Sequence, residues 1–134
     1  MMWLISEIVA IELPSPKFPN LVFTSYSQTT SNHQTWFTDQ RNYDVIACNY
    51  ETDEIFDPFA DFTLNRRGSK FQNYKYLWDH SDISTMYTNY FILDDDIVID
   101  VQDINCLFNV LEQYNLYALQ PSFDRKGKIV IKLH

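Results

Sequence analysis

The segment that decides the fold is Tyr90-Phe91-Ile92-Leu93-Asp94-Asp95-Asp96-Ile97, in which an apolar run ends in three consecutive aspartates. Four apolar residues without polar alternation predict a short β-strand covered on both faces, as in a parallel sheet. The aspartates then fall where this strand ends and a loop begins. A buried strand with an acidic end is therefore the feature from which both the fold and the chemistry are argued.

Apolar runs of the same kind occur before and after this segment. We expect further strands, some bounded by proline-rich or polar loops, at 20–25, 43–50, 59–64, 116–119 and 129–131. Pro121 is expected to stop the strand at 116–119, because proline cannot donate to a sheet ladder.

Two stretches have apolar residues at helical spacing. The first, over residues 71–78, follows the turn that contains Gly68, and the second is expected to be N-capped by Asp103 and to end near Asn115. Strands and helices therefore alternate along the chain. This alternation favours an α/β fold with a mostly parallel sheet flanked by helices.

Length and composition indicate one acidic domain with a substantial core. The chain has 134 residues, of which 46% are hydrophobic, so we expect a single domain over residues 1–134. The formal net charge of -8 would repel a phosphate backbone, so no nucleic-acid partner is expected.

The cysteines and the apolar start bear on the compartment. Cys48 and Cys106 each lie in an apolar run without a nearby partner, which is typical of reduced core residues and predicts a cytoplasmic location. The start, residues 1–13, contains Glu7 and Glu12 and lacks a basic flank, so we expect a strand or short packing helix and not a secretory signal. No apolar run reaches about 18 residues, so no membrane span is expected.

The three aspartates form the strongest candidate for a binding site. Adjacent carboxylates repel one another, and apolar runs on both sides disfavour an ordinary solvated turn, so a compensating cation is expected. In an extended chain Asp94 and Asp96 would point the same way and share a hard cation, Mg²⁺ or Mn²⁺, with a diphosphate. The alternative is a solvated acidic loop at a strand end.

A basic turn and a strand end supply further candidates. Arg66-Arg67-Gly68-Ser69-Lys70 opens the first expected helix, whose free N–H groups together with Arg67 or Lys70 could face a phosphate. Thr24 and Ser25 end the first expected strand, where ligands rest in parallel sheets. Ordinary surface turns and loops are the alternative for both.

The histidines give no comparable signal. His33, His80 and His134 show no spacing typical of a metal site, so they are expected to be surface residues.

Five blocks in this order resemble a known family: Asn20 to Ser25, Arg41 to Val45, Arg67 to Asn73, Phe91 to Ile97 and Leu119 to Phe123. They are similar to the nucleotide-diphospho-sugar glycosyltransferases of the GT-A fold, in particular small bacterial and viral members. The resemblance spans residues 20–124, leaves residues 1–19 as an extension, and implies a Rossmann-like sheet.

The resemblance also implies roles for single residues. Asp96 would bind Mn²⁺ or Mg²⁺ directly, and Asp94 would meet the ribose or a metal-bound water, beside Asp95. Lys70 and Arg67 would face the base or phosphates, and Thr24 and Ser25 would line the nucleotide pocket.

The implied reaction transfers a sugar from a nucleotide-diphospho-sugar to an unidentified hydroxyl acceptor, and no catalytic base is named. Only 38 residues follow Asp96, so the acceptor half of the family's fold is expected to be missing and a homo-oligomer to complete the domain.

Two other functions remain open. The aspartate run also matches the first motif of haloacid-dehalogenase-like phosphatases, in which Asp94 would be a nucleophile. That motif normally opens its domain, whereas about ninety residues precede it here. A non-catalytic nucleotide-binding, sugar-binding or interaction domain is the second alternative.

Overall fold

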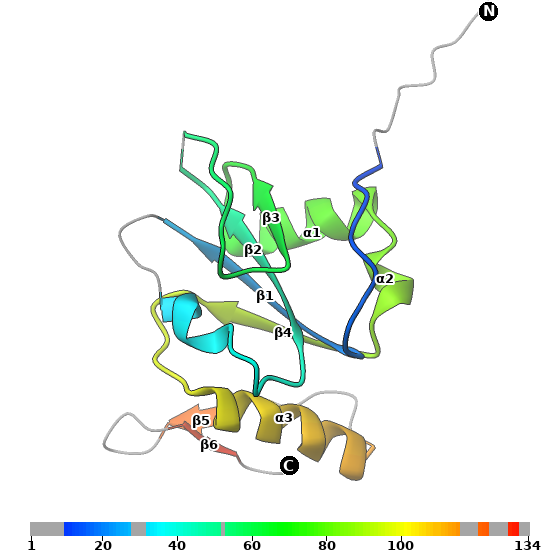
Figure 1. Ribbon diagram of the computed structural model, residues 1–134, viewed down its shortest axis with the longest axis vertical. Coiled ribbons are helices and arrows are strands. Elements are labelled where there is room, and N and C mark those ends of the chain that lie inside the picture. Colours follow the sequence, from blue (N-terminus) through cyan, green and yellow to red (C-terminus); the bar gives the residue numbers. More distant parts are fainter. Residues whose placement is uncertain (1–9, 28–31, 52, 116–120, 124–128, 132–134) are drawn as a thin grey trace, which may run out of the picture.

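The computed structural model describes residues 10–27, 32–51, 53–115, 121–123 and 129–131. Four strands form its main sheet: β1 (Asn20–Tyr26), β2 (Asp44–Asn49), β3 (Phe62–Asn65) and β4 (Asn89–Asp94). The helices are η1 (Asn32–Trp36), α1 (Lys70–His80), α2 (Ile83–Met86) and α3 (Val101–Gln113), and a separate pair of short strands, β5 (Pro121–Phe123) and β6 (Ile129–Ile131), follows (Figure 1).

The main sheet is parallel throughout and has the strand order β3-β2-β1-β4. β1 pairs on one side with β2, where Val22 lies opposite Val45, and on the other with β4, where Val22 lies opposite Phe91. All seven residues of β1 and all six of β2 are buried. The predictions of an α/β fold, of a mostly parallel sheet and of strands near 20–25, 43–50 and 90–93 are confirmed.

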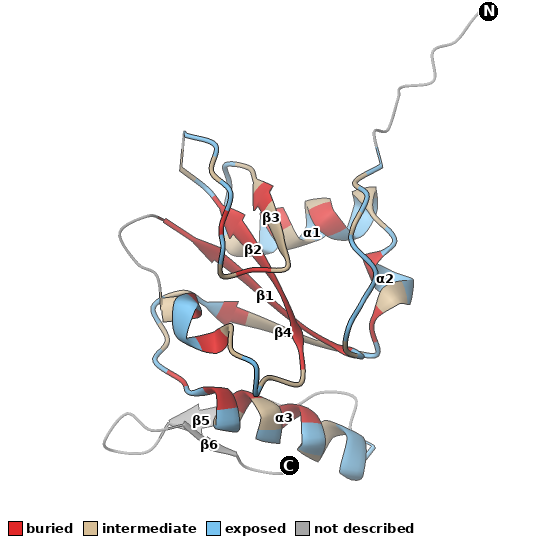
Figure 2. Cartoon of the chain, viewed as in Figure 1, coloured by how far each residue is buried: buried red, intermediate tan, exposed pale blue. Residues whose placement is uncertain are grey.

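Helices cover both faces of this sheet, and strand periodicity explains how (Figures 1 and 2). Leu21 and Phe23 point to one face, where they pack in a cluster with Leu77 of α1 and Ile83 of α2. Alternate residues of the same strand point to the other face, where the cluster contains Trp36 of η1 and Ile104, Leu107 and Phe108 of α3. The apolar runs lack alternation because both faces are covered.

The third strand begins later than the sequence predicts. The segment before Phe62 turns, because the Asp57 carboxylate accepts a hydrogen bond from Phe59 N–H at 2.8 Å and the Asp61 carboxylate accepts one from Val45 N–H at 2.7 Å. These side-chain bonds take the place of ladder bonds, so the strand expected over 59–64 lies at Phe62–Asn65.

Local capping fixes where the two long helices begin. Ser69 caps α1 and forms a capping box with Gln72, which confirms the helix expected over 71–78. α3 begins two residues before the expected cap, since Asp100 accepts the hydrogen bond from Asp103 N–H at 2.9 Å. Asp103 therefore lies inside the helix, and the prediction that it is the N-cap is wrong.

Three other predictions about the chain's ends and cysteines need correction or stay untested. The strand expected at 116–119 lies outside the described residues, so the prediction that Pro121 stops it stays untested, and Pro121 is the first residue of β5. Cys48 is buried, but Cys106 is exposed because it lies on the outer face of α3. Within the described part of the chain, no helix has the length and apolar character needed to cross a bilayer.

Residues 10–13, at the described end of the apolar start, form neither strand nor helix. Ile11 and Leu13 pack against the cluster on the α1 face, and Ile11 N–H donates to His80 O at 2.6 Å. The predictions of a single domain and of a homo-oligomer stay predictions.

One buried carboxylate makes the fold sensitive to pH. Asp44, at the start of β2, accepts hydrogen bonds from Tyr87 Oη at 2.7 Å and from Lys17 N–H at 3.0 Å, and its second oxygen has no partner among the described residues. Burial raises the pKa of Asp44 above its ordinary value, although these hydrogen bonds oppose the shift. The folded protein therefore holds this proton more tightly than the unfolded chain does.

We predict that Asp44→Asn removes a stability loss that wild type undergoes as pH rises. The favourable contribution of protonated Asp44 is complete below the unfolded carboxyl pKa of about 4 and disappears as pH rises through the raised folded pKa. Denaturant unfolding at several pH values should show the variant gaining on wild type as pH rises from about 4 through the raised folded pKa of Asp44. Exposed Asp39→Asn is the control, and parallel curves for Asp44→Asn and wild type would contradict the prediction.

Candidate functional site

The carboxyl ends of β1 and β4 lie at the switch point of the strand order. The chain runs from β1 to β2 and β3 on one side and then returns to add β4 on the other side of β1. The helices that follow β1 and β4, η1 and α3, both pack on one face of the sheet, whereas α1 packs on the other. In open α/β sheets, ligands bind outside the carboxyl ends of the strands at such a point. Ser25 and Asp94 are register partners at this switch point.

Lys70 and Asp94 meet at this switch point. Lys70 Nζ lies 2.5 Å from Asp94 Oδ1, so the first residue of α1 reaches the last residue of β4. The lysine side chain is 18% exposed and the aspartate 55%, which leaves the carboxylate open to solvent. The structure thus brings together two residues that the sequence singled out in different motifs.

Asn73 joins the turn before α1 to the end of β1. Its fully buried side chain donates through Nδ2 to Ser25 Oγ at 3.4 Å and to Gly68 O at 3.2 Å, and its Oδ1 accepts from Arg66 Nη1 at 2.9 Å. Gly68 has φ 140°, which side chains rarely adopt, and a Cβ there would lie 3.0 Å from Asn73 Oδ1. Asn73 therefore fixes the basic turn against Ser25, a role that the sequence analysis missed.

The structure separates the other predicted residues from this pair. Thr24 is fully buried on the opposite face of β1 from Ser25, and its hydroxyl has no partner among the described residues. Arg67 is exposed and lines a different hollow of about 400 Å³ on the outer side of α1. The guanidinium of Arg66, which lines the same hollow, stacks over the Tyr76 ring at 4.2 Å.

The aspartates lie in a turn and not in an extended strand. β4 ends at Asp94, and Ile97 N–H donates to Asp94 O at 3.3 Å, so the chain reverses through Asp95 and Asp96. The expected arrangement, with Asp94 and Asp96 on one side of an extended chain, is therefore wrong. A turn separates the three like charges and keeps Asp94 and Asp96 exposed to water, which an extended buried chain could not do.

The donor set fits a divalent cation only if a ligand completes the shell. Among the described residues no three His, Cys, Asp or Glu side chains cluster as a protein metal site would require. Mg²⁺ is commonly held by one or two carboxylates together with substrate phosphates and waters, and the exposed carboxylates of Asp94 and Asp96 suit that arrangement. Lys70 would then exchange its contact with Asp94 for one with a phosphate.

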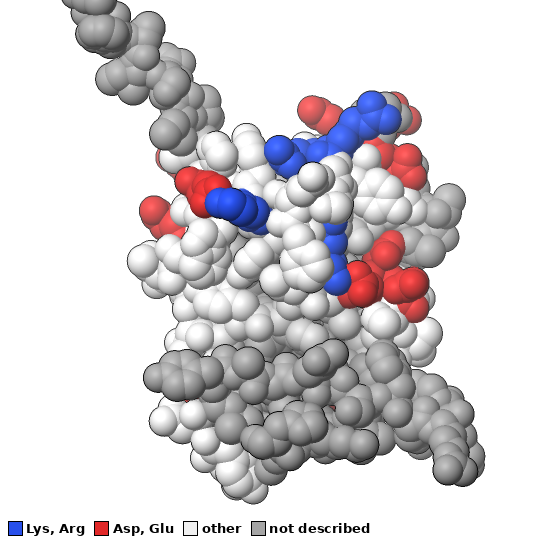
Figure 3. All heavy atoms as spheres, turned by 180° about the vertical axis from the view of Figure 1, so that it is seen from behind, with Lys and Arg blue, Asp and Glu red and all other residues white. Residues whose placement is uncertain are grey.

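Charge on the face shown in Figure 3 is paired locally. The Lys and Arg side chains visible there lie next to Asp or Glu, with uncharged surface between these groups. Four of the chain's ten Lys and Arg residues lie within residues 66–75, which contain no Asp or Glu. Three of these four, Arg66, Arg67 and Lys75, line the hollow on the outer side of α1, whereas Lys70 reaches Asp94.

His33 is the clearest residue that the sequence analysis placed wrongly. It was expected at the surface, but it is buried, and its Nε2 lies 2.5 Å from Asp57 Oδ2. The two residues line a hollow of about 310 Å³ with Tyr26 at the end of β1. His33 lies in a polar stretch and its partner is 24 residues away, so no local pattern could have revealed the pair.

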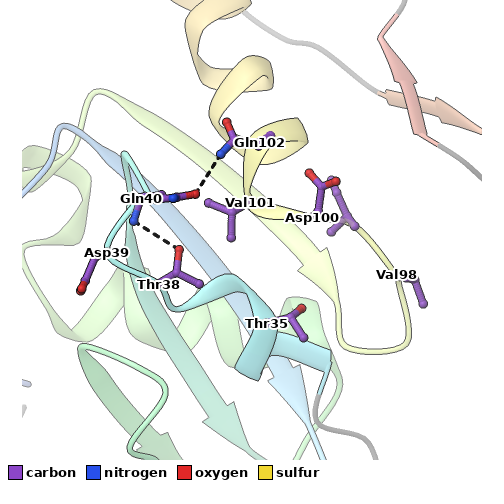
Figure 4. Close-up of a pocket in the computed structure, with 9 residues that line it drawn as sticks. Thr35, Thr38, Asp39, Gln40, Val98, Asp100, Val101 and Gln102 are labelled. Carbon is purple, nitrogen blue, oxygen red and sulfur yellow. Dashed lines mark hydrogen bonds between the residues drawn. The ribbon is translucent and has the colours of Figure 1, made fainter.

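A larger open hollow of about 750 Å³ lies between the η1 to β2 connection and the start of α3 (Figure 4). Gln102 Nε2 donates to Gln40 Oε1 at 3.1 Å across one part of it, and the side chains of Thr35 and Val98 line another. Val98 is 79% exposed although it is apolar. It lies two residues after Asp96, so this hollow begins beside the aspartate turn.

Comparisons with protein-family models, with curated proteins and with solved structures found no match to this chain.

We predict that Asn73→Ala destabilises the protein by about 2 kcal/mol or more, because it leaves buried partners of Asn73 without hydrogen bonds. Chemical denaturation should show this as a lower midpoint with little change in slope. Lys75→Ala is the matched control on the same helix, since its ion pair with Asp79 is exposed and should contribute less than about 1 kcal/mol. Equal effects of the two substitutions would contradict the role assigned to Asn73.

Proposed function

We propose that this protein binds a nucleotide-diphospho-sugar at the carboxyl ends of β1 and β4 and transfers the sugar to a hydroxyl acceptor. The observation that supports this most is the convergence of Lys70, Asp94, Ser25 and Asn73 at the switch point of a parallel sheet. The chain's resemblance to GT-A glycosyltransferases gives the same function.

The phosphates would lie at the start of α1. Three features favour an anion there: the N–H groups of the first helical turn, the positive end of the helix dipole, and the Lys70 ammonium. The ammonium is held by Asp94 and the lysine side chain is only 18% exposed, so the charge is positioned before any ligand arrives. A positioned cation loses less side-chain entropy on binding than a mobile surface lysine would.

A bound Mn²⁺ or Mg²⁺, held by Asp96 and Asp94, would neutralise the negative charge that builds up on the departing nucleoside diphosphate. Lys70 would share this task, because its ammonium already lies at the Asp94 carboxylate. The hollow that Val98 lines lies next to the aspartate turn in sequence. The acceptor would bind in this hollow.

We predict that calorimetry with UDP, GDP and their sugars detects binding that Mn²⁺ strengthens and that Asp96→Ala makes independent of the metal. Lys70→Gln should weaken nucleotide binding roughly tenfold or more, because a charge-assisted hydrogen bond to a phosphate is lost.

The control variants are Asp79→Ala and Lys75→Gln, which alter an exposed ion pair on the same helix and should change neither affinity nor metal dependence. No binding of any nucleotide in the presence of Mn²⁺ would refute the proposal. Formation of an aspartyl-phosphate at Asp94 would instead support the phosphatase alternative.

A further inference from the structure

The hollow of about 400 Å³ on the outer side of α1 is surrounded by positive charge. Three cations, Arg66, Arg67 and Lys75, line it together with one carboxylate, that of Asp79. It therefore has a local excess of two positive charges, although the whole chain carries a net charge of -8. Lys70 does not line it, so the hollow is separate from the proposed nucleotide site.

Two of these cations are not used by the fold's ion pairs. Four of the six Lys and Arg residues in the described part of the chain form ion pairs with an aspartate: Lys17, Arg41, Lys70 and Lys75. The other two, Arg66 and Arg67, form none with the described residues, and both line the hollow. In so acidic a chain, two adjacent arginines without a described ion pair remain available to an external anion.

The guanidinium of Arg66 is held in place by uncharged groups. It stacks over the Tyr76 ring at 4.2 Å, and its Nη1 donates to Asn73 Oδ1 at 2.9 Å. A guanidinium has five N–H donors, and the hydrogen bonds that Arg66 forms with described residues leave Nε–H and the Nη2 donors unused. A planar donor fork fixed in this way matches two oxygens of a phosphate and loses little side-chain entropy on binding.

Two neutral side chains add polar atoms to the same hollow. His80 Nδ1–H donates to Tyr76 O at 2.8 Å, because a carbonyl can only accept, so Nε2 is the ring nitrogen left for a ligand. This nitrogen accepts from a hydroxyl when the ring is neutral and donates to a phosphate oxygen when the ring is charged. Gln72 Oε1 accepts from Ser69 N–H at 2.9 Å, which leaves the Gln72 amide N–H groups as donors.

The third cation can change partner at little cost. Lys75 Nζ lies 2.7 Å from Asp79 Oδ2, but the two side chains are 75% and 45% exposed. Exposed ion pairs of this kind contribute about 0 to 1 kcal/mol, so a ligand anion can take the place of Asp79 at Lys75. The Asp79 carboxylate should therefore weaken anion binding, both by competing for Lys75 and by repulsion.

We propose that this hollow binds the phosphate group of a small anion, either inorganic phosphate or a phosphate ester, without a metal ion. The phosphate oxygens accept hydrogen bonds from Arg66, Arg67 and Lys75. A phosphate monoester carries a charge of about -1.5 to -2 near pH 7, which matches the local excess of two positive charges, whereas a carboxylate supplies only one negative charge. The same excess repels Mn²⁺ and Mg²⁺, so this inference does not rest on the proposed metal-dependent nucleotide site.

The test is calorimetry of the full chain in EDTA and low salt with inorganic phosphate, glucose 6-phosphate, gluconate and glucose. We expect the two phosphates to bind, gluconate to bind roughly tenfold or more weakly, and glucose not to bind. Added salt should weaken phosphate binding, because the hollow is open to water. Tighter binding of glucose 6-phosphate than of inorganic phosphate identifies an ester as the ligand, and the reverse order identifies free phosphate.

Two substitutions should change phosphate affinity in opposite directions. Arg67→Gln should weaken it roughly tenfold or more, because a charge-assisted hydrogen bond is lost. Asp79→Asn should strengthen it about two- to fivefold, because Lys75 is released and a repulsive charge is removed. Both positions are exposed, so neither change should unfold the protein. Exposed Asp39→Asn is the matched control for Asp79→Asn and should leave the affinity unchanged.

Lys70→Gln separates this inference from the proposed function, because it removes the cation of the nucleotide site and should leave phosphate binding in the hollow intact. Phosphate binding that is lost in Lys70→Gln but kept in Arg67→Gln would overturn the inference and favour the switch point. Equal binding of gluconate and glucose 6-phosphate, or no binding of either phosphate at millimolar concentration, would also overturn it. Phosphate binding that depends on Arg67, in a protein that binds no nucleotide with Mn²⁺, would refute the proposed function and support this inference.

Discussion

The complete burial of β1 between two parallel neighbours is the constraint on which the rest of the structure depends. Every residue of this strand is buried, and its backbone is paired with β2 on one side and β4 on the other. Its side chains divide between the two clusters that hold the helices to the sheet. A shift of one residue in its register would exchange the residues facing the two clusters.

The same register places the candidate site. It sets Ser25 opposite Asp94 and brings the end of β1 next to the start of α1 and to the hollow beside η1. Two carboxylates at this end each contact a side-chain nitrogen, Lys70 Nζ for Asp94 and His33 Nε2 for Asp57, and Asp57 also accepts from Phe59 N–H. The first pair is partly open to water and suits exchange with a ligand, whereas the second is buried.

The sequence predicted the parts of the fold that are governed by local pattern. The right elements were predicted for β1, β2 and β4 from their apolar runs, and for α1 and α3 from the helical spacing of their apolar residues. Burial on both faces requires an apolar run, and an amphipathic helix requires apolar residues at helical spacing, so both can be recognised in the sequence. The predicted starts of elements were wrong where a side-chain carboxylate accepts a backbone N–H hydrogen bond. The shortened β3 depends on the carboxylates of Asp57 and Asp61, and the start of α3 on that of Asp100.

Less of the candidate site could be predicted, for a physical reason. Lys70 and Asp94 were visible as a basic turn and an acidic strand end, but that they touch follows only from the strand order. Asn73 and His33 act through partners 48 and 24 residues away, and no periodicity encodes such pairs. Thr24 and Ser25 are adjacent in sequence, but successive side chains of a strand point to opposite faces of the sheet. The prediction that both residues line one nucleotide pocket did not take this alternation into account.

The central claim is that a nucleoside diphosphate binds at the carboxyl ends of β1 and β4, with its phosphates at the start of α1. The most direct measurement is an amide ¹H–¹⁵N chemical-shift map of the protein titrated with UDP or GDP in the presence of Mg²⁺. The account predicts that the largest changes fall at the end of β1, at the first turn of α1 and at the aspartate turn. Changes confined to the hollow between Gln40 and Val98, or no changes at millimolar nucleotide, would contradict it.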